Sequence, residues 1–150
     1  MVLDALLAYA HFASLFIMVS FIGAEAMLLR TQPGALSILA LARSDIGYFF
    51  SAMLVIATGL LRLFLGAKGA AFYSGNPLLY VKLVLFAAVG IISIKPTLQF
   101  IRWRKAVVAD PSFRPATTAV ASARRLVFLE MHLIALIPLA AVFMARGVGN

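Results

Sequence analysis

The sequence contains no cysteine, and that absence excludes several kinds of chemistry. Without thiols the chain can form no disulfide, hold no iron–sulfur cluster and use no thiol nucleophile. Charged residues are also scarce: they make up 12% of the 150 residues, and only 5 of them are acidic. The 2 histidines belong to no HExxH or Glu-x-x-His motif, so no zinc or di-metal site is indicated. A P-loop and a GxGxxG motif are also missing, which argues against nucleotide chemistry.

Long apolar runs are what the chain has instead. It is 64% hydrophobic, with a mean hydropathy of +1.06, far above the level of soluble domains. Four runs, at about 5–29, 46–65, 78–101 and 126–145, approach or exceed the roughly 20 residues that cross a bilayer. The segment Ala35–Arg43 is apolar but too short to cross, so it either lies along the interface or extends the second helix. We predict an all-α, integral membrane four-helix transmembrane bundle in which residues 1–150 form one domain.

The net charge of +8 fits a membrane protein better than a nucleic-acid-binding one. No basic patch with interleaved aromatic residues lies on a soluble domain, so we expect the lipid bilayer, and no nucleic acid, as a partner. Four spans place both termini on one side. The positive-inside rule then puts the connections after the first and third spans in the cytoplasm, because nine of the thirteen basic residues lie on that side. These nine are Arg30, Arg43, Lys95, Arg102, Arg104, Lys105, Arg114, Arg124 and Arg125. Arg62, Lys68, Lys82 and Arg146 lie on the other side. The predicted location is a bacterial inner membrane with both termini periplasmic.

Ionisable residues inside the apolar runs are the candidate functional residues, since such groups are costly in lipid. In the first run, Asp4, His11, Met18 and Glu25 recur every seven residues and therefore share one helix face. Helical rise sorts the polar residues into two layers. The outer layer, near the termini, contains His11, Arg62 and Lys82. The inner layer, near the connections, contains Glu25, Arg30, Arg125, Glu130 and His132.

The outer layer has the composition of a haem b site. His11 would bind the haem iron as a neutral imidazole, and Lys82 and Arg62 would meet the haem propionates. Two alternatives stay open: His11 bonds only to a neighbouring helix while Lys82 extends to the interface, or the slot holds a quinone or a tetrapyrrole without a histidine ligand. His11 and His132 belong to different layers, so one haem within a monomer cannot use both; an exchange of helix ends between protomers would revive that pair.

The inner layer allows two interpretations. Glu25 and Glu130 can form buried ion pairs with Arg30 and Arg125, because a buried carboxylate must be paired or protonated. Alternatively, the two carboxyl groups and His132 form a proton relay. Asp45 stands just before the second run, where it is a plausible helix N-cap together with Ser44.

The first and third runs resemble a known group of proteins. The stretch HFASLFIMVSFIGAEAMLLR has an early histidine and a terminal arginine, and YVKLVLFAAVGIISI opens with a lysine. Together they resemble the HemJ and CopD-like superfamily, and the whole chain looks like an uncharacterised four-helix branch of predicted membrane proteins near it. The resemblance implies a bundle that binds haem b, with His11, Arg30 and Lys82 at the matching positions, and HemJ proteins are protoporphyrinogen oxidases. The third run lacks the Tyr-His pair often found in HemJ. Two histidines and six methionines do not make the soft site of a copper protein.

The sequence thus predicts a haem b-binding membrane redox protein, in a homo-oligomer or larger complex, that transfers electrons or oxidises a lipophilic substrate such as a tetrapyrrole or quinol. The alternative is a non-enzymatic membrane protein: an accessory subunit or a small transporter. A transporter needs a polar path through the midplane, and the sequence predicts an apolar middle between the two layers.

Overall fold

The computed structural model describes residues 2–66 and 74–149, and four long helices make up most of them. In chain order these are α1 (Val2–Leu28), α2 (Ala35–Leu65), α4 (Pro77–Ala109) and α5 (Thr117–Ala145). Each is long and apolar enough to cross a membrane. The predicted four-helix membrane bundle is confirmed.

The helices extend beyond the apolar runs that predicted them. α2 has 31 residues, which is about 46 Å of helix against a hydrocarbon core of about 30 Å. An apolar run therefore marks the part of a helix that lies in lipid, not the whole helix. Residues 35–43 extend the second helix, and Asp45 lies inside it. The predicted N-cap role of Asp45 is wrong for this reason.

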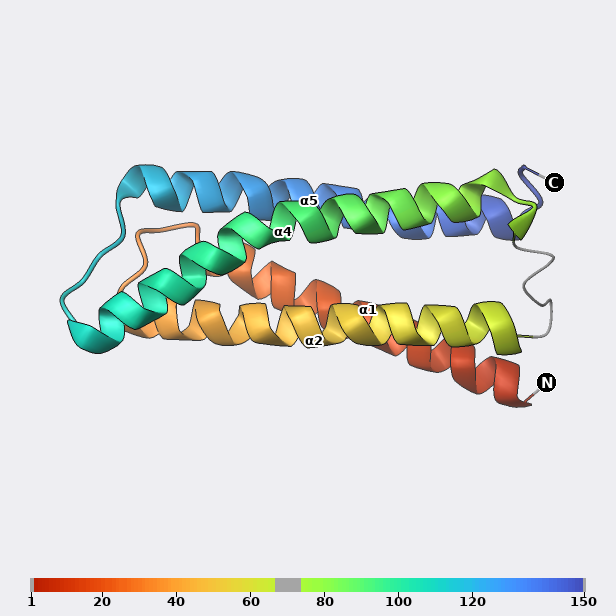
Figure 1. Ribbon diagram of the computed structural model, residues 1–150, viewed down its shortest axis with the longest axis horizontal. Helices are drawn as coiled ribbons and strands as arrows, with labels where there is room; N and C mark the ends of the chain where they lie inside the picture. Colours follow the sequence, from red (N-terminus) through yellow and green to blue (C-terminus); the bar gives the residue numbers. More distant parts are fainter. Residues whose placement is uncertain (1, 67–73, 150) are drawn as a thin grey trace.

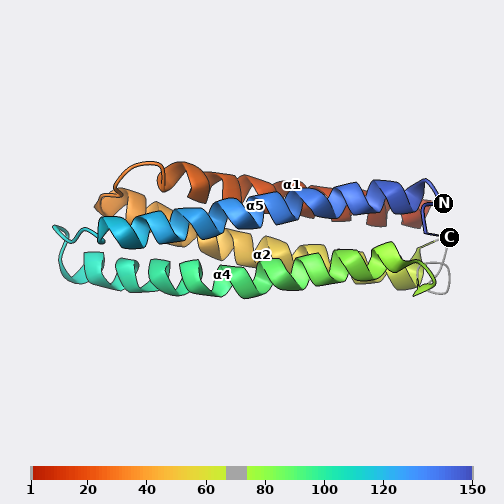
Figure 2. The ribbon, with the colours of Figure 1, turned by 90° about the horizontal axis from the view of Figure 1, so that it is seen from above.

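Two helix pairs build the bundle. α1 packs on α2 and α4 packs on α5, and contacts between α2 and α4 and between α1 and α5 join the pairs. Both chain ends lie at one end of the bundle, called here the terminal end (Figure 1). The α1–α2 and α4–α5 connections lie at the other, the connection end, and Figure 2 shows the same arrangement from above. Pro96 lies inside α4, and the part of α4 nearer the connection end inclines toward α2 (Figure 1).

The packed core is concentrated in the half of the bundle nearer the connection end. Large side chains with 1% exposure or less come from all four helices. They include Met18, Ile22, Ile38, Leu41 and Phe100. At the terminal end, by contrast, no residue in the ranges 2–13, 56–66 and 77–88 is buried, and the buried residues of α5 there are Ala140 and Met144. The two helix pairs therefore pack tightly at one end and loosely at the other.

The nine basic residues assigned to the connection side are all exposed there. They follow or precede the apolar parts of the helices, where their charged groups reach water and lipid headgroups. Of the four basic residues on the other side, Lys68 lies outside the described residues. The charge asymmetry expected from the sequence thus corresponds to two distinct ends of the bundle.

Close packing between α1 and α2 depends on Gly47. A Cβ atom there would overlap the Phe21 ring, whereas a Cβ at Gly90 would meet nothing within 4 Å. We expect Gly47→Ala to lower the free energy of unfolding by about 1–2 kcal/mol, because the ring must move. Gly90→Ala should be neutral or stabilising, since alanine favours a helix. Unfolding in mixed detergent micelles measures both; equal stability of the two variants would contradict this packing.

Candidate functional site

Three carboxyl groups are buried in the bundle, on helices that are mostly apolar. Glu25 of α1, Asp45 of α2 and Glu130 of α5 are exposed by only 2%, 7% and 1%. Glu25 lies close enough to the other two to interact with them electrostatically. We refer to Glu25, Asp45 and Glu130 as the carboxyl cluster.

Hydroxyl groups from two helices complete this cluster. Tyr48 of α2 donates a hydrogen bond to Glu130 Oε2 at 3.2 Å. Thr97 of α4 donates to Asp45 Oδ1 at 2.7 Å. All four helices therefore contribute to one buried polar group, so the cluster depends on the assembled bundle.

The predicted ion pairs of the inner layer are absent from the described structure. Glu25 Oε1 and Glu130 Oε1 are buried and have no hydrogen-bond partner within the described residues. Arg30 and Arg125 are exposed instead. Both arginines lie close enough to the connection end for their guanidinium groups to reach water, which costs less than entering the apolar core.

His132 also lies apart from the cluster. Its side chain is exposed, and its Nδ1 is 2.6 Å from the Phe128 carbonyl oxygen of the same helix. Two residues apart on a helix, Glu130 and His132 face different directions. Asp45 and Tyr48 take the place predicted for His132. Asp45, Tyr48 and Ser51 follow one another at intervals of three residues. This spacing indicates that they lie near one face of the helix.

His11 contacts the neighbouring helix α2. Its Nδ1 is 3.0 Å from Thr58 Oγ1, and it lies beside Gly59, where a Cβ would be 3.3 Å from the histidine ring. Thr58 Oγ1 in turn donates to the Leu54 carbonyl oxygen at 2.6 Å. The half-buried imidazole is thus held in one orientation by α2.

The two predicted cations lie near His11. Arg62 and Lys82 are both close enough to interact electrostatically with it and with each other. The guanidinium carbon of Arg62 is 5.7 Å from the centre of the Phe12 ring. The structure therefore brings together His11, Arg62 and Lys82. It does not bring Arg30 to them, because Arg30 follows the opposite end of α1, about 28 Å of helix away.

Buried hydroxyl groups lie between the two polar groups. Ser14 of α1 is 6% exposed and Ser51 of α2 is 2% exposed, and each donates to a backbone carbonyl of its own helix. The predicted apolar middle is therefore only partly right: Met18 and Val55 are buried there too, but hydroxyl groups accompany them. Ionisable residues alone give no indication of these buried serine hydroxyl groups.

The described ranges contain no group of three or more His, Asp or Glu side chains arranged to hold a metal ion. The family model for "Predicted membrane protein (DUF2214)" matches residues 3–149. No curated protein and no solved structure matches the chain.

Proposed function

The chain belongs to the DUF2214 family of predicted membrane proteins, and we propose that it is a redox protein that binds haem b near the terminal end through His11. The hydrogen bond between His11 Nδ1 and Thr58 Oγ1 carries this proposal. Thr58 directs its own proton to a backbone carbonyl oxygen, so its oxygen accepts from His11 Nδ1–H. His11 Nε2 then carries the lone pair, which is the form that binds haem iron.

The surrounding charges suit the propionate groups of haem. Arg62 comes from α2 and Lys82 from α4, so the cations belong to different helix pairs. A planar group held between the pairs could reach both, and each cation would form charge-assisted hydrogen bonds with a carboxylate. Lys82 has no hydrogen bond or ion pair within the described ranges, which leaves its ammonium group available.

The loose packing at the terminal end supports the same ligand. Since no residue in the ranges 2–13, 56–66 and 77–88 is buried, α1, α2 and α4 leave apolar surface exposed there. A porphyrin needs such an apolar slot. Bound haem would supply one-electron transfer. The resemblance to HemJ proteins makes a tetrapyrrole the first substrate to test and a quinol the second, both arriving through the bilayer.

Orientation completes this proposal. With the connection end in the cytoplasm of a bacterial cell, the histidine site lies near the periplasmic face of the inner membrane. A lipophilic substrate would then be oxidised in the outer half of the bilayer.

A visible spectrum tests the proposal directly. The full-length protein is purified in detergent from cells supplied with a haem precursor, and spectra are recorded oxidised and after dithionite reduction. We expect a Soret band and an α-band that sharpens on reduction. Protein that stays colourless in the presence of excess haem would overturn haem binding.

The unpartnered oxygens of Glu25 and Glu130 favour a second function, a proton relay in the carboxyl cluster. A carboxyl group without a cation is stable in an apolar interior when it holds a proton. Such a group can release or accept that proton when the charge nearby changes. Asp45 and Tyr48 replace His132 in this relay.

A further inference from the structure

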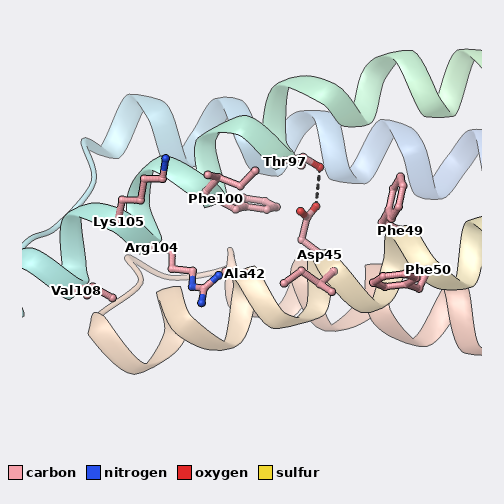
Figure 3. Close-up of a pocket in the computed structure, with 11 residues that line it drawn as sticks. Ala42, Asp45, Phe49, Phe50, Thr97, Phe100, Arg104, Lys105 and Val108 are labelled. Carbon is pink, nitrogen blue, oxygen red and sulfur yellow. Dashed lines mark hydrogen bonds between the residues drawn. The ribbon is translucent and has the colours of Figure 1, made fainter.

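A groove of about 730 Å³ lies between α2 and α4 in the half of the bundle nearer the connection end. Figure 3 shows its residues, with Asp45 and Thr97 joined by their hydrogen bond. Its walls are mostly apolar and include Ile46, Phe49 and Phe50 of α2 and Ile101 of α4. These four side chains are 43% to 63% exposed. They therefore form an apolar surface open to the surrounding lipid.

The groove has one apolar end and one cationic end. Arg104 and Lys105 line it on α4, about 10 Å of helix beyond Thr97 toward the connection end. Figure 3 shows the Arg104 side chain extending from α4 toward α2 beside Ala42. Within the described residues, neither cation has a hydrogen bond or an ion pair.

Within the described residues, no acidic group forms an ion pair with these cations. Asp45 also lines the groove, but it is 7% exposed and accepts the hydrogen bond of Thr97. The exposed acid of the connection end is Asp110, and it accepts hydrogen bonds from the Ser112 backbone N–H and Oγ. Those bonds lower the pKa of Asp110, which keeps it a carboxylate directed at the turn. The cationic end of the groove is thus free to attract an anion from outside the chain.

We propose that this groove binds one anionic phospholipid, with its phosphate at the end lined by Arg104 and Lys105 and an acyl chain along Phe49, Phe50 and Ile101. Charge complementarity and direction both support this occupant. The cations lie at the membrane-surface end and the apolar wall leads into the bilayer, which is the arrangement of charge and chain in a lipid. A free phosphate would leave the apolar wall uncovered. A zwitterionic lipid would bring a cation next to two cations. The inference is independent of haem.

Tryptophan fluorescence in vesicles tests the site. Trp103→Phe first removes the native tryptophan. A single new tryptophan is then placed in the groove by Phe50→Trp or, in a second protein, outside it by Phe16→Trp. Each protein is reconstituted in phosphatidylcholine with a fixed fraction of brominated phosphatidylglycerol or brominated phosphatidylcholine. We expect the groove tryptophan to be quenched more by the anionic lipid. The tryptophan at position 16 should not distinguish the two lipids.

Two double variants establish whether the cations are responsible. In Arg104→Gln/Lys105→Gln, the ratio of phosphatidylglycerol to phosphatidylcholine binding should fall by about fivefold or more. One basic residue near an anionic lipid contributes about fivefold in affinity. Arg124→Gln/Arg125→Gln removes an adjacent exposed pair from α5 at the same end and should keep the preference. Native mass spectrometry of both variants with Trp103 intact, after phosphatidylglycerol is added, gives the same comparison without engineered tryptophans. Equal quenching by both lipids at position 50, or equal loss in both double variants, would overturn the proposal.

Discussion

His11→Ala is expected to purify without haem absorption, while His132→Ala keeps the full spectrum of the unsubstituted protein. The chain has 2 histidines, so each variant is a matched control for the other. In the proposed site, Thr58 holds His11 through Nδ1, which would leave Nε2 to bind iron. His132 is exposed, and its Nδ1 lies against its own helix. Visible spectra of both variants, prepared in parallel at equal protein concentration, give the comparison.

The opposite result would be informative as well. Equal haem content in both variants would mean that His11 is not an axial ligand, and loss in both would indicate that two protomers share one haem through His11 and His132.

Thr58→Val separates ligation from orientation, because it removes the hydrogen bond and keeps the shape of the side chain. We expect this variant to retain the spectral type but to bind haem about 10–100-fold more weakly, the usual effect of losing a second partner of a metal-bound histidine.

The fold could be predicted from the sequence because the bilayer dictates it. A backbone in hydrocarbon must satisfy its own hydrogen bonds, so four apolar runs require four helices. The group of His11, Arg62 and Lys82 was also predictable, since helical rise places all three at one depth. What depth alone could not give was the direction of each side chain around its helix.

At the carboxyl cluster, prediction and structure differ because of the direction in which each side chain leaves its helix. Arg30, Arg125 and His132 have the right depth to join Glu25 and Glu130, but they are exposed. Asp45 has the right depth and direction. Ser44 and Asp45 stand just before the apolar run, so the sequence predicts a helix start there, whereas α2 begins at Ala35. Hydrophobic length fixes where lipid begins along a helix, whereas the helix itself continues as long as hydrogen bonds and neighbours support it.

Amide substitutions in the carboxyl cluster are expected to remove an infrared signal without unfolding the bundle. In the unsubstituted protein we expect, at neutral pH, the carbonyl stretch of protonated carboxylic acids from Glu25, Asp45 and Glu130, which lack a cation within the described structure. Glu25→Gln, Asp45→Asn and Glu130→Gln should each remove about a third of that band, because each removes one of three carboxyl groups. Asp110→Asn should not change it, since Asp110 is exposed and charged at that pH.

A further variant decides whether the cluster is a proton site or only a packing feature. Tyr48→Phe removes the hydroxyl that donates to Glu130 Oε2 and leaves the ring, so the Glu130 component of the band should shift while the total band area is kept. An unchanged band would mean that Tyr48 and Glu130 do not share a proton position, and absence of the band from the unsubstituted protein would contradict the relay.

Exchange into deuterated buffer tests the relay through the rate at which the carboxyl protons are replaced. A relay connected to water should exchange its carboxyl protons faster than the backbone amides of the core, because core amides must wait for local opening of the helix.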